Sequence, residues 1–169
     1  NRHYNTEAFF EKTVLLRKYF PGCAITTDVI VGFPGETEEE FNTTYEYLKK
    51  IKFFETHIFP YSRRKGTIAD RMEGQLTANE KKVRVTKLLD LDAKLSAEFR
   101  KSKLGEETDV ILEETKTING KEYIVGHTPE YIMTALEIEN GTLDLIGQKI
   151  SVRLENMLND EVVFASAIK

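Results

Sequence analysis

The sequence predicts an α/β region followed by an all-β region within 169 residues. Helical periodicity alternates with β-branched runs up to about residue 75, whereas residues 104–169 hold only short strand-like runs separated by turns. The charge changes at the same place, because residues 104–169 carry 5 basic and 13 acidic side chains against 19 and 15 in the rest of the chain. We therefore expect an α/β domain at 1–75, a connecting helix at 76–103 and a β-barrel at 104–169.

The α/β region is expected to begin with a helix from Asn5 to Phe20, which ends at Pro21-Gly22. The apolar face of this helix is expected to hold Phe9, Phe10, Thr13, Val14, Leu16 and Phe20. Strands are expected at 24–31 and 54–59, with a helix at 37–51 between them. The β-branched run at 29–31 is typical of a strand covered on both faces. Because the links are short, the two strands should be parallel.

Residues 32–35 read Gly-Phe-Pro-Gly and form a turn between the first strand and a helix capped by Thr37 and Glu40. In parallel α/β sheets, ligands bind beyond the carboxyl ends of the strands. Four glutamates at 36–40 make this helix N-terminus unfavourable for phosphate, so a neutral or cationic ligand is expected there. A tight turn that binds nothing fits the same residues about equally well.

Residues 60–67 read Pro-Tyr-Ser-Arg-Arg-Lys-Gly-Thr and follow the second strand directly. We expect this segment to meet the glycine turn at the same edge of the sheet. An aromatic ring beside Arg63, Arg64 and Lys65 is a combination that can stack on RNA bases and contact phosphates. A solvated basic loop is the other interpretation.

Thr77 and Glu80 form a second capping box, which opens a long helix to about Lys103. Its apolar stripe holds Val85, Leu88, Leu91, Leu95 and Phe99. The five short strands expected after it lie at 108–113, 122–126, 131–138, 148–154 and 161–168, with a hairpin turn at Asn119-Gly120. These strands predict a small five-stranded barrel of the oligonucleotide-binding (OB) kind.

The net charge of −8 on residues 104–169 opposes RNA binding by this barrel. Binding therefore requires that its cations gather on one face, namely Lys116, Lys121, Lys149 and Arg153. His127, at the start of a barrel loop, is a candidate for stacking on a base. The three histidines are too dispersed for a metal site, and the single cysteine, Cys23, excludes an intrachain disulfide or an iron–sulfur site built by this chain alone.

Residues 27–37 and 57–67, which include the glycine turn and the basic loop, resemble the later part of the radical S-adenosylmethionine methylthiotransferases. Residues 104–168, with Glu113-Glu114 and the stretch Gly-His-Thr-Pro-Glu-Tyr at 126–131, resemble the carboxyl-terminal TRAM domain of that family. The segment at 57–67 is most similar to the enzymes that act on N6-threonylcarbamoyladenosine next to the tRNA anticodon. Relatives acting on isopentenyladenosine share much of this pattern, whereas those acting on a ribosomal protein usually carry acidic residues at the positions of Arg63 and Arg64.

The resemblance implies the carboxyl-terminal fragment of a partial (βα)6 radical SAM barrel, a long connecting helix and an OB-like TRAM barrel. It also implies S-adenosyl-L-methionine as cofactor, 4Fe-4S clusters in the full-length parent, and a tRNA anticodon stem-loop as partner. The cofactor contacts carried over from the family pattern are Ile30, Val31, Gly32, Pro34, Gly35, Glu36, Phe59, Tyr61 and Ser62. We assign no catalytic and no metal-binding residue to this chain.

Because the family's three-cysteine motif is absent, we expect the chain alone to be inactive and to depend on an amino-terminal part of the parent protein. Uncovered strand edges predict self-association. The apolar runs are too short to span a bilayer and no leader opens the chain, so a cytoplasmic location without a membrane partner is expected. The alternative function is a non-catalytic RNA-binding module that keeps a βα scaffold.

Overall fold

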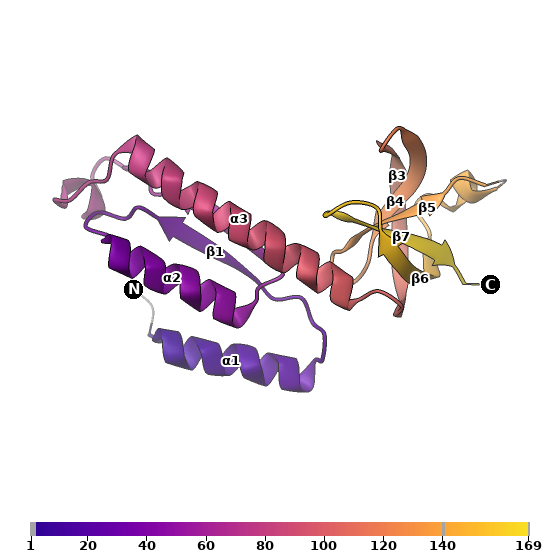
Figure 1. The fold of residues 1–169 in the computed structure, drawn as a ribbon, viewed down its shortest axis with the longest axis horizontal. Helices are drawn as coiled ribbons and strands as arrows, with labels where there is room; N and C mark the ends of the chain where they lie inside the picture. The colour runs from indigo at the N-terminus through magenta and orange to yellow at the C-terminus, as the bar shows by residue number, and fades with distance from the viewer. Residues whose placement is uncertain (1–2, 140, 169) are drawn as a thin grey trace. The chain divides into compact units, whose positions relative to one another are not determined.

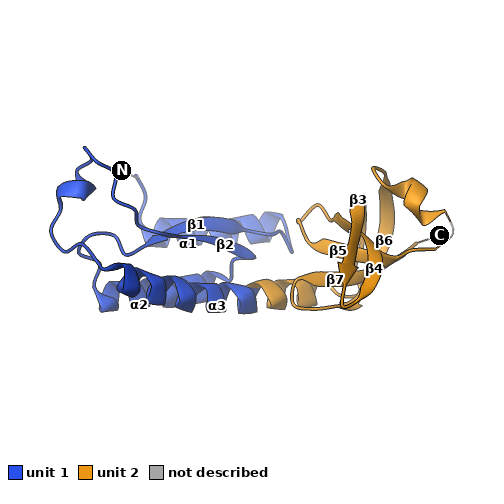
Figure 2. Cartoon of the chain, turned by 90° about the horizontal axis from the view of Figure 1, so that it is seen from above, with its two compact units in different colours: residues 1–95 blue, residues 96–169 orange. Residues whose placement is uncertain are grey.

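The computed structural model describes residues 3–139 and 141–168. The chain divides into two compact units, residues 1–95 and 96–169, which Figure 2 colours separately. The division falls inside the helix α3 (Ala78–Ser102), so this helix contributes residues to both units. No helix in the described part of the chain has the length and apolar character needed to cross a membrane.

The first unit alternates helices and strands in the predicted order (Figure 1). Its elements before α3 are α1 (Thr6–Tyr19), β1 (Thr26–Val31), α2 (Glu38–Ile51), β2 (Glu55–Pro60) and the 3-10 turn η1 (Ala69–Arg71). Strands β1 and β2 pair in parallel, with Val31 opposite Pro60 at their carboxyl ends. The α/β prediction is therefore confirmed for these elements, and the two strands end at one edge of the sheet.

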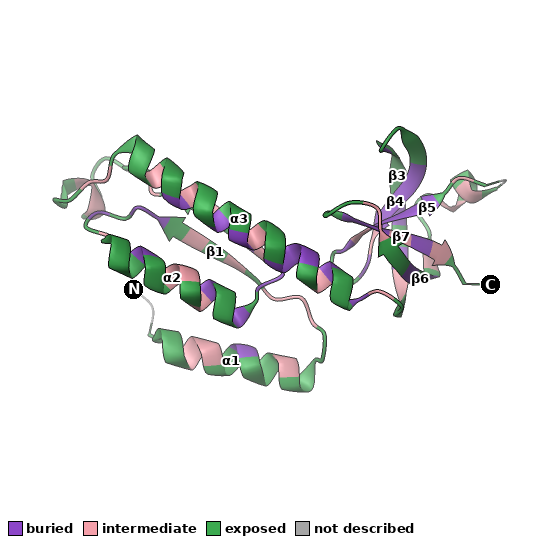
Figure 3. Ribbon diagram, viewed as in Figure 1, coloured by how far each residue is buried: buried purple, intermediate pink, exposed green. Residues whose placement is uncertain are grey.

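Helices α2 and α3 lie against one face of this sheet (Figures 1 and 2). Figure 3 shows buried residues along both helices, whereas β1 is buried only at its end. The buried residues of this core are Val31, Phe41, Leu48, Ile51, Phe53, Leu88, Leu91 and Leu95. The predicted stripe of α3 thus packs where expected in this unit, with Val85 against the same core.

The other face of the sheet is bare, and it carries Asp28, Ile30, His57 and Phe59. Ile30 is 59% exposed and Phe59 is 50% exposed, although both are large apolar side chains. The expectation of a strand covered on both faces is therefore wrong for the described residues. The reason is that side chains alternate along a strand, and only one set of them meets a helix.

Helix α1 also departs from the prediction. Its amino-terminal half packs as expected, with Thr13 buried and Phe9 and Phe10 against the core. Its carboxyl-terminal half leaves a run of apolar side chains exposed, namely Val14, Leu15, Leu16, Tyr19 and Phe20. A helical stripe shows which residues prefer burial, but no described element of this unit covers that half.

The second unit is a closed barrel with the strand order β3-β4-β5-β7-β6. Its strands are β3 (Glu107–Ile118), β4 (Lys121–His127), β5 (Met133–Glu137), β6 (Lys149–Met157) and β7 (Val162–Ala167), with a 3-10 turn η2 (Thr142–Leu145) before β6. Neighbouring strands are antiparallel except β5 and β7, which are parallel. The prediction of five strands in a small barrel is confirmed.

Strand β3 is longer than predicted because it continues to Ile118 past an irregularity between Leu112 and Glu114. The added residues are mostly polar and exposed, so they lack the alternation that marks a strand in sequence. The hairpin turn is as predicted, since Asn119 and Gly120 both have positive φ, at 51° and 80°. This geometry is the one that a two-residue turn with Asn-Gly adopts.

Candidate functional site

The glycine turn and the basic loop converge beyond the carboxyl ends of β1 and β2. The Tyr61 amide donates a hydrogen bond of 2.8 Å to the Val31 carbonyl, which continues the strand pairing past the sheet. The Phe33 and Tyr61 rings lie 5.3 Å apart at an angle of 67°. The expected convergence of the two segments is therefore confirmed.

A hollow of about 490 Å³ lies beside this edge. It is lined by Ile30, Phe59, Pro60, Tyr61, Ser62, Arg64, Thr67 and Ala69. Four of the nine predicted cofactor contacts, Ile30, Phe59, Tyr61 and Ser62, are brought together here. Its walls include the apolar side chains that the bare sheet face exposes.

The other five predicted contacts shape the turn and do not line the hollow. Val31 and Pro34 are buried. The Gly35 amide donates to the Gly74 carbonyl at 2.8 Å. Gly32 has φ +72°, and a Cβ at this position would lie 2.3 Å from Lys81 Cγ. The close approach that requires glycine at this position is therefore made by α3.

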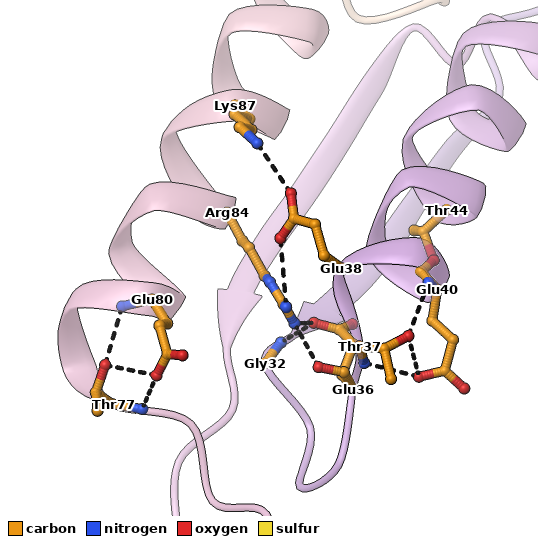
Figure 4. A network of polar contacts seen from close by, with 10 residues as sticks. All are labelled: Gly32, Glu36, Thr37, Glu38, Glu40, Thr44, Thr77, Glu80, Arg84 and Lys87. Carbon is orange, nitrogen blue, oxygen red and sulfur yellow. Dashed lines mark hydrogen bonds and ion pairs between the residues drawn. The ribbon is translucent and has the colours of Figure 1, made fainter.

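Glu36, the last of the five, holds the turn to α3 (Figure 4). Its carboxylate accepts a 2.8 Å hydrogen bond from the Gly32 amide and a shorter one from Arg84. Arg84 also donates to the Glu36 carbonyl at 3.0 Å and lies 3.6 Å from the Glu38 carboxylate. Since Arg84 is only 7% exposed, this is a buried ion pair whose charges depend on one another.

The neighbouring carboxylates are also engaged within the protein. Lys87 binds Glu38 at 3.2 Å. Glu40 completes the predicted capping box with Thr37, through hydrogen bonds of 2.8 and 3.1 Å. The electrostatic reason for expecting a neutral or cationic ligand is therefore weaker than the sequence indicates, and the apolar lining of the hollow becomes the better reason.

The second capping box forms at the start of α3, where Thr77 and Glu80 bind each other as predicted. The Thr77 hydrogen bonds lower the pKa of the Glu80 carboxyl. Farther along the same helix, Lys81 donates to the Tyr61 carbonyl at 3.1 Å. The first turns of α3 therefore contact both segments of the strand-end rim.

The Tyr61 side chain carries a buried polar atom that lacks a partner in the described residues. Its hydroxyl oxygen is buried and makes no hydrogen bond. Such a group costs stability unless a ligand or water satisfies it. The hollow itself offers the exposed apolar side chains Ile30 and Phe59, which fit a flat, mostly apolar ring.

The three cations of the basic loop have different surroundings. Arg63 is tied down, with hydrogen bonds of 3.1 and 2.7 Å to the side chain and carbonyl of Asp70. Arg64 lines the hollow, and Lys65 is exposed. Of the three loop cations, Arg64 and Lys65 are therefore without an acidic partner in the described chain.

The predicted cations of the barrel do not gather on one face. Lys149 and Arg153 stand on β6 opposite the first half of β3, whereas Lys116 and Lys121 stand at the β3–β4 hairpin. Three of them are bound to carboxylates. These pairs are Lys121 with Glu137, Lys149 with Asp109 at 2.9 Å, and Arg153 with Glu107 at 2.6 Å.

These ion pairs shift the pKa values of their members. Hydrogen bonds from Lys149 and Ser151 lower the pKa of the Asp109 carboxyl. The Glu137 carboxylate raises the pKa of Lys121, and Glu107 raises that of Arg153. From the sequence, an RNA-binding face is expected to need all four cations on one face of the barrel. The structure does not bring the four together. Lys116 has no carboxylate partner within the described residues, and its amine lies 3.7 Å from the Met133 sulfur.

His127 is at the end of β4, and its Nδ1 lies 3.0 Å from both carboxylate oxygens of Glu113. One face of its ring is covered by Tyr131, with centroids 4.5 Å apart and planes 20° from parallel. Tyr131 is not among the site residues expected from the sequence. No pattern of spacing predicts this stack, because it depends on a loop conformation.

Within residues 3–139 and 141–168, no group of three or more histidine, cysteine, aspartate or glutamate side chains is arranged to hold a metal ion.

No family model matches the sequence. The chain is 43% identical over 154 residues to the threonylcarbamoyladenosine tRNA methylthiotransferase MtaB of Bacillus subtilis. This match covers 90% of the chain and 34% of MtaB. It is 35% identical over 157 residues to a tRNA-2-methylthio-N(6)-dimethylallyladenosine synthase of Acetivibrio thermocellus, and the match covers 93% of this chain and 32% of that protein. It is 38% identical over 148 residues to the ribosomal protein uS12 methylthiotransferase RimO of Carboxydothermus hydrogenoformans, and the match covers 88% of this chain and 32% of that protein. The chain thus spans about a third of the length of these relatives.

Proposed function

The chain belongs to the radical S-adenosylmethionine methylthiotransferase family, and on this premise we propose that it is part of an enzyme that methylthiolates N6-threonylcarbamoyladenosine next to the tRNA anticodon. The observation that carries the choice of substrate is the 43% identity to a threonylcarbamoyladenosine enzyme. The basic residues Arg63 and Arg64 agree with a tRNA substrate. In this proposal, residues 1–75 are the last strands of a radical SAM barrel and residues 104–169 are a TRAM barrel that binds the anticodon stem-loop.

The hollow at the strand ends is the proposed rim of the cofactor site. Ile30 and Phe59 would contact the adenine ring of S-adenosyl-L-methionine, and Tyr61 and Ser62 would close the rim of its site. Gly32 and Glu36 would act indirectly, by holding the turn against Arg84. The bound cofactor supplies the radical chemistry, and the residues of this chain position it.

The 169-residue chain by itself is proposed to be inactive. A 4Fe-4S cluster is held by several thiolates, and this chain has one cysteine, Cys23. Assay of the purified chain with the cofactor and a chemical reductant is expected to give no 5′-deoxyadenosine. Formation of that product would contradict the proposal.

The substrate is tested in cells by deleting the gene and analysing nucleosides of bulk tRNA by mass spectrometry. We expect loss of the methylthio group from threonylcarbamoyladenosine, with the methylthiolated isopentenyladenosine unchanged. Loss of the latter, or of the methylthio group on ribosomal protein uS12, would overturn the choice of substrate.

A ribosomal protein is the second candidate substrate. The barrel region has a net charge of −8, and three of its four predicted RNA contacts are bound to carboxylates, which favours a basic partner. The relative at 38% identity acts, by its name, on uS12. Against this candidate stand the cations Arg64 and Lys65 at the rim of the hollow.

Self-association of the isolated chain is proposed from its exposed apolar surface. Ile30 and Phe59 lie on the bare sheet face, and Leu15, Leu16 and Phe20 are exposed on α1. Sedimentation velocity over a range of concentrations is expected to show dimers or larger species. The double variant Leu15→Glu, Phe20→Glu is expected to reduce them, and a monodisperse wild-type monomer would contradict this proposal.

A further inference from the structure

Tyr131 presents an aromatic ring to solvent at the end of strand β4. The residue is 68% exposed, whereas the His127 side chain beneath it is 18% exposed. Because the two rings are stacked 4.5 Å apart, Tyr131 covers one face of the imidazole and leaves its own outer face open. The surface available for stacking at this place is therefore the tyrosine ring.

The backbone holds this ring in place without a ligand. Tyr131 has φ +66°, which is a rare conformation for a bulky residue. The Tyr131 amide donates to the Thr128 carbonyl at 2.9 Å, and Thr128 exchanges hydrogen bonds of 3.1 and 3.2 Å with Ile132. Thr128 and Ile132 are both buried, so the loop that carries Tyr131 is anchored on each side.

Glu113 fixes the supporting imidazole from the other side. A carboxylate only accepts hydrogen bonds, so the His127 Nδ1–H donates to it. This bond sets the orientation of the ring on which Tyr131 stacks.

A cation without a carboxylate partner lies near the stack. Lys116 Nζ is 3.7 Å from the sulfur of Met133, and Met133 pairs directly with His127 across the β4–β5 ladder. Opposed residues in such a ladder have their Cβ atoms roughly 5 Å apart. The other predicted barrel cations, Lys121, Lys149 and Arg153, are held by carboxylates.

We propose that Tyr131, supported by His127 and Glu113, is a stacking platform for one unpaired nucleobase, and that Lys116 contacts the phosphate backbone of the same RNA. This inference rests on the proposed function, in which the barrel binds RNA. A base stacks on an aromatic face with little dependence on its identity. An arginine-rich peptide would also stack on tyrosine, but Lys116, which has no carboxylate partner in the described residues, would repel it.

The test measures binding of a fluorescein-labelled anticodon stem-loop RNA to the full 169-residue chain by fluorescence anisotropy. Tyr131→Ala is expected to weaken binding by about ten- to a hundredfold. Tyr131→Phe keeps the ring and serves as the matched control, with the affinity of the wild type. Lys116→Gln is expected to reduce the slope of log K against log salt by about 1, whereas Lys149→Gln leaves it unchanged because Asp109 already neutralises this lysine.

Amide NMR spectra show whether the barrel stays folded in each variant. If Tyr131→Ala unfolds it, Tyr131→Leu keeps most of the volume without an aromatic ring and is expected to show the same loss. Wild-type affinity in the folded variant would overturn the platform while leaving RNA binding by the barrel intact. Absence of RNA binding by the wild-type chain would overturn both, and a loss confined to an arginine-rich peptide would assign Tyr131 to a protein partner.

Discussion

The two units use ion pairs differently. In the first, Arg84 and Glu36 form a buried pair that joins α3 to the glycine turn. In the barrel, Lys149–Asp109 and Arg153–Glu107 are exposed pairs between neighbouring strands. A buried pair cannot lose one member without leaving a charge in a poor solvent, whereas an exposed pair can. We conclude that ion pairing fixes local geometry at the turn, whereas on the barrel it mainly neutralises individual surface charges.

The largest effect is expected from Arg84→Met, which leaves the Glu36 carboxylate buried without its cation. We expect a loss of about 3–5 kcal/mol in the free energy of unfolding, measured by urea denaturation at pH 7. The control is Lys87→Met on the same helix, whose exposed pair with Glu38 is worth less than about 1 kcal/mol. Equal losses from both variants would contradict the distinction between the two kinds of pair.

Gly32→Ala is expected to cost more than Gly35→Ala. Both positions have positive φ, which costs about 1–2 kcal/mol for alanine. Only at Gly32 would the new Cβ also meet a side chain, that of Lys81. Adding Lys81→Ala to Gly32→Ala should therefore bring the loss down to that of Gly35→Ala, and a double variant as unstable as Gly32→Ala would show that Lys81 is not the cause.

Thr37→Ala removes the hydroxyl that caps α2 and is expected to cost about 1 kcal/mol in unfolding free energy. Thr37→Ser retains the acceptor and should stay close to the wild type. Hydrogen exchange of the Glu40 amide is the specific measurement, because this amide loses its partner only in the alanine variant. Unchanged exchange in that variant would show that the cap is not formed in solution.

The smallest effect is expected from Lys149→Gln on the barrel surface, with only a slight lowering of the urea midpoint at pH 7. This small difference is expected to depend on pH. The folded pKa of Asp109 is lowered by Lys149, so the pair stabilises the fold above the unfolded pKa and loses this contribution as pH falls through the folded value. Any difference from the wild type should therefore shrink as the pH falls through and below the ordinary pKa range of an aspartate, and a difference that grows on acidification would contradict the assignment.

Much of this fold could be predicted because its signals are local. The Thr37 and Thr77 caps and the Asn119-Gly120 hairpin form as expected, since each depends on residues a few positions apart. The extension of β3 could not be predicted, because its polar, exposed residues carry no alternation. The half-bare sheet could not be predicted either, since the sequence of a strand does not state how many of its faces a neighbour covers.

The candidate sites show the same division. The parallel strands place Ile30, Phe59 and Tyr61 at one hollow, as the order of elements indicates. Only the structure shows which glutamate is neutralised and which barrel cations are already paired. Because the carboxylates at the turn bind other protein groups, they favour a cationic ligand less than the sequence indicates. Three of the four barrel cations are paired with carboxylates and are therefore less available to RNA than expected.

By itself, therefore, the sequence determined the order of the elements, their caps and turns, and the similarity to methylthiotransferases. The tertiary structure alone decided which distant side chains meet: Arg84 with Glu36 across 48 positions, and Lys149 with Asp109 across 40. The physical reason is that propensity, capping and turn geometry act over a few residues. Pairing between distant side chains depends on strand register and on the packing of α3 over the sheet.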